Sequence, residues 1–172
     1  MTGKHAFEPT RRSRILVLVV LPALALLLTV AAAVFKWQVA SSTGAERART
    51  ESVQAARDIT VEMLSYQPDT VEQQLHAARE RMTGQFLGIY TAMIENAVIP
   101  GAKSQGVTAV AEVPQAGSVS ASPDRAEVLL YLNQTVTVAQ KPPQKTVSTV
   151  RVTMVNEDGR WLMSKFEPVT AQ

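Results

Sequence analysis

Apolar residues form one unbroken run near the start of the chain and recur at two different spacings after it. Residues 15–35 read ILVLVVLPALALLLTVAAAVF and include no charged side chain. A helix of about 21 residues rises roughly 31 Å, which matches a bilayer core of about 30 Å. A buried core helix explains the segment poorly, because the segment has no polar face. We therefore predict a membrane-spanning helix over residues 15–35, anchored by side chains that include Ile15, Leu21, Leu28 and Phe35.

The residues on the two sides of this run predict its orientation. Arg11, Arg12 and Arg14 precede it, and Lys36 and Trp37 follow it. Positive charge near a span favours the cytoplasmic side and tryptophan favours the interface, so we expect a cytoplasmic N-terminus and an extracytoplasmic C-terminal part. The rival interpretation is a signal peptide cleaved after the alanines at 31–33. The length of the run and its direct passage into a helical pattern favour an uncleaved, single-pass anchor in the cell membrane.

After the anchor, apolar positions first recur at helical spacing. Three amphipathic helices are predicted between residues 46 and 95. Their apolar stripes are Val53, Ala56, Thr60, Met63 and Leu64; Val71, Leu75, Ala78 and Met82; and Phe86, Leu87, Tyr90 and Ile94. Pro100 and Gly101 are expected to close this helical half.

From Val107 the apolar period changes to two, which predicts strands. We expect strands over residues 107–113, 125–139, 145–156 and 160–169, with a loop over 114–123 and a hairpin turn at Asp158-Gly159. The apolar residues of the last strand do not alternate cleanly, so a bulge near Ser164 is expected. Helices followed by antiparallel strands predict an α+β fold, with about three helices packed on a curved antiparallel sheet of about four strands.

These segments divide the chain of 172 residues into four parts. They are a cytoplasmic tail at 1–14, the membrane helix at 15–35, a stalk at 36–52 and an extracytoplasmic α+β domain at 53–170. A single folded domain with one accessory segment fits this length.

The long strand over residues 125–139 has two different faces. One carries Ala126, Val128, Leu130 and Leu132 and is expected to face the helices. The other is expected to be open, and we predict a partner-binding surface there. Its residues are Glu127, Leu129, Tyr131, Asn133 and, from the next strand, Arg151. The alternative is an ordinary amphipathic face covered by the chain's own loops.

The composition argues against several kinds of chemistry. There are no cysteines and only two, widely separated histidines, which disfavours thiolate or histidine metal sites. A net charge of +2 gives no basic footprint for nucleic acid. The sequence lacks the short motifs that mark nucleotide-binding loops, zinc-protease helices and the nucleophile elbow of serine hydrolases. We therefore predict no catalytic residue, cofactor or metal, and not an enzyme.

Several short stretches together resemble one known family. They are Met63-Leu64-Ser65-Tyr66, Thr83-Gly84-Gln85-Phe86, Asn133-Gln134-Thr135, Arg151-Val152-Thr153-Met154 and Gly159-Arg160-Trp161-Leu162. In this order, and with a single N-terminal span, they resemble the actinobacterial Mce-associated membrane proteins (Mce for mammalian cell entry). The resemblance implies a cystatin-like or nuclear-transport-factor-like cone. It also implies an accessory role in assembling or stabilising an Mce-type lipid import system, with the bilayer and transporter subunits as partners.

Two other functions stay open at this point. The same cone could hold a lipid or steroid in an apolar cavity. It could also be an enzyme of the ketosteroid-isomerase kind, which needs an acid or base in the apolar pocket, for instance opposite Tyr90. The predicted inward positions carry no Asp or Glu, which disfavours the enzyme. A homo-oligomer is compatible with each of these functions.

Overall fold

The computed structural model describes the backbone of residues 21–139 and 141–169, and the side chains of residues 29, 44–139 and 141–169. The chain divides into two compact units, Met1–Ser42 and Thr43–Gln172. The predicted positions Arg11, Arg12, Arg14 and Ile15 lie outside the described residues. Helix α2, Leu21–Leu64, includes Leu21, Leu28, Phe35, Lys36 and Trp37, whose side chains are not among those described. Among the described residues, no helix combines the length and apolarity needed to cross a membrane.

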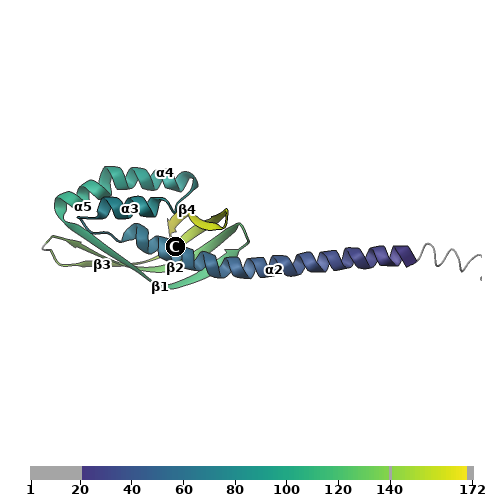
Figure 1. The fold of residues 1–172 in the computed structure, drawn as a ribbon. Helices are drawn as coiled ribbons and strands as arrows, with labels where there is room; N and C mark the ends of the chain where they lie inside the picture. The colour runs from purple at the N-terminus through teal and green to yellow at the C-terminus, as the bar shows by residue number, and fades with distance from the viewer. Residues whose placement is uncertain (1–20, 140, 170–172) are drawn as a thin grey trace, which may run out of the picture. The chain divides into compact units, whose positions relative to one another are not determined.

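Within Thr43–Gln172, helices precede strands along the chain (Figure 1). After α2 come α3 (Val71–Arg79), α4 (Gly84–Met93), the π-helical turn η2 (Ile94–Val98) and α5 (Ile99–Gln105). The strands are β1 (Val107–Ala121), β2 (Arg125–Val138), β3 (Gln144–Glu157) and β4 (Arg160–Pro168). They form one antiparallel sheet in the order β1-β2-β3-β4. The predicted α+β class, with helices on a four-stranded antiparallel sheet, is confirmed.

The core lies between the helices and one face of the sheet. From the sheet it receives alternate residues of β2, as predicted, and from the helices the predicted stripes of α2, α3 and α4. Fully buried members include Ile59, Leu75, Tyr90, Ile94, Leu130, Val152 and Met163. Packing of α2 into this core begins at Ala48, which is 3% exposed.

The helical half continues past its predicted end. Pro100 and Gly101 lie inside a continuous helical run, and the expectation that they close it is wrong. Proline lacks an amide hydrogen and is tolerated in the first turn of a helix, and Pro100 is in the first turn of α5. The run ends instead at Gly106, whose left-handed backbone has φ 62°.

The first strand is also longer than predicted, and the loop expected over residues 114–123 is mostly strand. β1 pairs with β2 along its whole length, with register shifts between Glu112 and Gln115 and between Ser118 and Ser120. Each shift places one extra residue on β1, which defines a β-bulge. Pro114 lies at the first bulge of an edge strand, where a missing amide hydrogen costs no interior ladder bond.

Two local predictions for the last hairpin are confirmed. Asp158 and Gly159 have φ of 53° and 81°, as a two-residue turn between twisted strands requires. A register shift leaves Ser164 without a partner in the β3–β4 ladder, because Thr153 pairs with Lys165 and Met154 with Met163. The Ser164 hydroxyl donates to the Thr153 carbonyl at 3.2 Å, which gives this bulge a polar contact.

Candidate docking face of the sheet

The side of the sheet that faces away from the helices is built from three neighbouring strands. Residues directly opposite one another in an antiparallel pair share a face. Leu129 lies opposite Gly117 of β1 and Arg151 of β3, and Tyr131 lies opposite Gln115 and Thr149. We call this surface the open face and define it by Val110, Gln115, Gly117, Glu127, Leu129, Tyr131, Asn133, Val147, Thr149 and Arg151.

Large apolar side chains are exposed on the open face. The exposed fractions are 50% for Val110, 37% for Leu129, 42% for Tyr131 and 58% for Val147. On the opposite face of the same strand, Val128 and Leu130 are 0% exposed. Figure 1 shows α3, α4 and α5 on one side of the sheet. The helices therefore cover one face of the sheet, and the predicted partner residues are on the other.

The centre of the open face is hollowed. A depression of about 360 Å³ is lined by Gln115, Gly117, Leu129, Tyr131 and Thr149, together with parts of Ala116 and Leu130. Gly117 has no side chain, and a Cβ built there would meet no atom within 4 Å. Leu129 and Tyr131 form apolar walls, while Gln115 and Thr149 supply groups that can donate and accept hydrogen bonds. The depression can thus receive a protruding side chain of a partner.

The charges of the open face are sparse. Arg151 is exposed beside Leu129, and its cross-strand neighbour Glu167 forms its ion pair with Lys165 instead, at 2.8 Å. Arg151 and Glu127 have no ion-pair partner among the described residues. Each can therefore contact a charge on a partner without first breaking an internal pair.

Asn133, like Glu127, is less accessible than the other three predicted positions. Its side chain is partly buried, and its Oδ1 is fully buried with no hydrogen-bond donor in the described part of the chain. It lies opposite Glu112 of β1 and Val147 of β3. The five predicted positions therefore share one face but differ in access.

Sequence reasoning missed the part of the open face that β1 contributes. Gln115 and Gly117 were expected in a loop, yet they line the depression. Val110 and Val147 were expected in strands but were not assigned to the surface. The alternation of polar and apolar residues in these strands was the only available signal for these four positions. It shows which residues share a face only when the register of all three strands is known.

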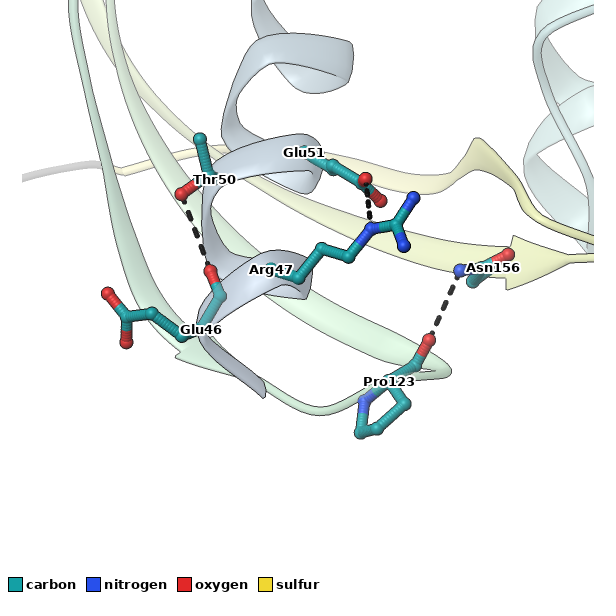
Figure 2. A network of polar contacts seen from close by, with 6 residues as sticks. All are labelled: Glu46, Arg47, Thr50, Glu51, Pro123 and Asn156. Carbon is teal, nitrogen blue, oxygen red and sulfur yellow. Dashed lines mark hydrogen bonds and ion pairs between the residues drawn. The ribbon is translucent and has the colours of Figure 1, made fainter. Parts of the chain in front are cut away.

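A separate polar cluster lies where α2 meets the β1–β2 turn (Figure 2). Arg47 Nε donates to Glu51 Oε1 at 2.6 Å, and this bond lowers the pKa of Glu51. Asn156 Nδ2 donates to the Pro123 carbonyl at 3.2 Å. The Arg47–Glu51 pair is one helical turn apart and solvent-exposed, so it is most simply a helix-surface ion pair.

Few polar side chains are buried among the described residues. The Tyr90 hydroxyl donates to the Met63 carbonyl at 3.1 Å, and burial raises the pKa of Tyr90. The buried polar residues of the described part are Ser52, Thr60 and Thr153, none of which carries a carboxylate. Among the described residues, no group of three His, Cys, Asp or Glu side chains could hold a metal. A carboxylate opposite Tyr90, which the enzyme alternative requires, is therefore not found in this region.

Fold and surface together define a class of protein: an α+β domain with helices on one face of a four-stranded antiparallel sheet and a bare second face. Solved structures of this kind share the fold at low sequence identity. A type IV secretion system protein of Legionella pneumophila that is IcmL-like matches with a TM-score of 0.58 and 10% identity, over 72% of this chain and 95% of that one. The periplasmic domain of DotI matches with a TM-score of 0.55 and 14% identity, over 69% and 93%.

Among known sequences, the outer membrane protein Rv1973 of Mycobacterium tuberculosis is 51% identical over 91% of this chain and 98% of its own length. The chain therefore belongs to the family of that protein. No family model matches the sequence. The Mce-associated resemblance is thus carried by the residues quoted above alone.

Proposed function

We propose that this chain is a membrane-anchored accessory subunit of a cell-envelope complex, and that it binds a partner protein through the open face. The observation that carries the proposal is a bare sheet face with exposed Leu129 and Tyr131 beside a depression. Monomeric domains seldom expose clustered apolar side chains, and such clusters are typical of protein-binding surfaces. Binding needs no catalytic group, in keeping with the hydrogen bond that the Tyr90 hydroxyl donates to the Met63 carbonyl.

The comparisons support a place in the cell envelope. The family relative is named an outer membrane protein, one structural neighbour is a type IV secretion system protein and another is a periplasmic domain. These names, and the charge pattern of Arg11, Arg12 and Arg14 before the apolar run, favour a domain on the outer side of the cell membrane. Residues 15–35 would then tether the domain beside its partner, with the residues between 36 and Ala48 as the stalk, because Ala48 already packs into the core.

The resemblance to Mce-associated proteins suggests the identity of the partner. An Mce-type lipid importer is an envelope assembly of several subunits, and the proposed role is to support its assembly or stability through protein contacts. Lipid binding inside the fold has less support, because fully buried side chains such as Ile59, Tyr90 and Leu130 occupy the space between helices and sheet.

The test is affinity purification of the full chain from native membranes, followed by quantitative mass spectrometry. Leu129→Asp places a charge on the open face and should reduce co-purification of the transporter subunits at least tenfold. Ala77→Asp introduces the same charge at an exposed position of α3 and serves as the matched control. Equal recovery of subunits with both variants would contradict docking through the open face.

Two further outcomes concern the role and the anchor. If the chain supports assembly, its deletion should lower the abundance of the transporter subunits; normal abundance and normal lipid uptake would refute the role. If residues 15–35 form an anchor, the intact chain should sediment with membranes. A mature chain that is free in solution and lacks its first thirty-odd residues would refute the anchor.

A further inference from the structure

Strand β1 is an edge strand, and the β1–β2 ladder determines which of its backbone groups turn outward. Along an antiparallel pair, residues alternate between bonding to the neighbouring strand and turning their N–H and C=O to the other side. At one end of the ladder the Ala139 amide donates to the Gly106 carbonyl at 3.0 Å. At the other end the Ser122 amide donates to the Arg125 carbonyl at 2.8 Å. Odd-numbered positions along β2 therefore bond towards β1, and even-numbered positions bond towards β3.

Two residues of β1 turn their backbone groups away from the sheet by the same alternation. Ala116 lies opposite Leu130, and Ser118 lies opposite Val128. Because Leu130 and Val128 are even-numbered, the N–H and C=O groups of Ala116 and Ser118 point outward from the edge. No backbone group in the described part of the chain bonds to them. An edge with unpaired groups of this kind can pair with a further strand.

The chain itself already pairs with this edge near the beginning of β1. The Tyr66 amide donates to the Ala109 carbonyl at 2.9 Å, and the Ala109 amide donates to the Tyr66 carbonyl at 3.0 Å. The Ala111 amide donates to Ser65 Oγ at 3.0 Å. From Ala111 to the end of β1, no described residue outside the sheet pairs with the backbone of this strand. The edge thus accepts an extended segment, and the chain supplies one for only its first part.

A groove of about 610 Å³ follows the unpaired part of the edge. We call it the edge groove and define it by its lining residues, Arg49, Thr50, Val53 and Gln54 of α2 and Ala116, Gly117 and Ser118 of β1. The polar side chains of α2 bond within their own helix. Arg49 contacts Glu46 at 3.7 Å. Gln54 donates to Asp58 at 2.8 Å. The Ser118 hydroxyl is buried and has no hydrogen-bond partner among the described residues. The groove therefore contains polar groups of β1 that α2 does not satisfy.

We propose that an extended segment of the partner protein occupies the edge groove and pairs with β1 as an additional strand. The proposal rests on the docking through the open face that is proposed above. It continues that surface around the edge of the sheet, because the depression of the open face and the edge groove share Ala116 and Gly117. The chemistry that recognises the segment is a backbone with N–H and C=O groups about 7 Å apart, the spacing of alternate residues in a strand. Addition of a strand to an exposed sheet edge is a common way of binding extended peptides.

The two bulges of β1 limit the length of the added strand. Register shifts between Glu112 and Gln115 and between Ser118 and Ser120 enclose a regular part of the ladder, Gln115–Ser118. Bulges bend an edge and interrupt its pairing. The paired part of the segment is therefore about four residues long, or roughly 13 Å.

The side chains around the edge define the sequence of the segment. Residues paired with Ala116 and Ser118 direct their side chains towards α2, where Val53 is partly buried against the core, so small or apolar side chains fit there. The residue paired with Gly117 lies on the side of the open face. Gly117 has no side chain, so a large apolar group there has room beside Leu129. We expect small and large apolar residues to alternate in the segment.

The first test separates the backbone amide of Ser118 from its hydroxyl. Ser118→Pro removes the outward N–H but no ladder bond to β2, and edge strands tolerate proline in this position. Ser118→Ala removes the hydroxyl, keeps the amide and serves as the matched control. In affinity purification of the full chain from native membranes, Ser118→Pro should reduce recovery of the transporter subunits at least fivefold, whereas Ser118→Ala should reduce it less than twofold. Equal recovery with the two variants would overturn the proposal.

The second test needs no substitution, so it does not depend on the folding of a variant. Hydrogen exchange is measured on the wild-type full chain, once with its co-purified subunits and once after a high-salt wash has removed them. The amides of Ala116 and Ser118 should exchange at least tenfold more slowly with the subunits present. Unchanged exchange of the peptide that spans Gln115–Ser118 would also overturn the proposal.

Leu129→Asp distinguishes a failure of strand pairing from a failure of the docking face. Loss of the subunits with Leu129→Asp but not with Ser118→Pro would refute strand pairing and leave the open face as the docking surface. Undiminished recovery with Leu129→Asp as well would refute docking through the open face itself. A differently tagged second copy of this chain that is recovered with Ser118→Ala but not with Ser118→Pro would assign the edge groove to the chain itself and overturn the proposal.

Discussion

Replacing Tyr90 with phenylalanine removes one hydroxyl group from the centre of the fold and tests how α2 ends. Helix α2 stops at Leu64, so its last carbonyls need partners from outside the helix. The amide of Gln67, which would continue the ladder to Met63, donates instead to Gln74 Oε1 at 3.0 Å. The Met63 carbonyl is therefore satisfied by the Tyr90 hydroxyl at 3.1 Å, in a site where Tyr90 is 0% exposed.

The expected loss follows from leaving that carbonyl buried and unpaired. An unsatisfied buried acceptor costs about 1–3 kcal/mol, so Tyr90→Phe should lower the free energy of unfolding by about 2 kcal/mol. In urea, with an m value of roughly 2 kcal/mol/M, the midpoint should fall by about 1 M. The urea midpoint is measured by circular dichroism of the unit that begins at Thr43.

The matched control is Tyr131→Phe. Tyr131 is 42% exposed, and its hydroxyl makes no hydrogen bond within the described part of the chain. Removal of the Tyr131 hydroxyl should change the urea midpoint of unfolding by less than the experimental error. Equal midpoints for the two variants would refute the capping role assigned to Tyr90.

The remaining predictions concern backbone conformation and one ion pair. Gly88→Ala should raise the free energy of unfolding by about 0.5–1 kcal/mol, because alanine is more favourable than glycine inside a helix. Gly106→Ala should lower it by about 1–2 kcal/mol, because Gly106 has φ 62°. Shifts of the same sign for the two variants in urea unfolding would contradict this reasoning. The Lys103 ammonium donates to Glu72 and lowers the pKa of that carboxylate. The contribution of this ion pair to the free energy of unfolding is therefore complete above the ordinary pKa of glutamate and is lost as the pH falls through the lowered pKa. Lys103→Met should raise the pKa of Glu72 in an NMR titration, and an unchanged titration would show that the pair is absent in solution.

Periodicity was enough to predict the elements whose burial is one-sided. In β2 the residues of one phase, such as Val128 and Leu130, are buried as predicted, because a strand with one apolar face has only one favourable register. The turn at Gly159 and the bulge at Ser164 were predictable without knowledge of the tertiary structure. Each is encoded by its own local sequence.

Where tertiary pairing overrides a local signal, the sequence was misleading. Pro114 looked like the start of a loop, but an edge strand accommodates proline at a bulge. Pro100 looked like the end of a helix, but it lies in the first turn of α5 after a π-helical turn. The depression of the open face could not be predicted for the same reason, since the first bulge of β1 sets the register that brings Gln115 and Gly117 beside β2.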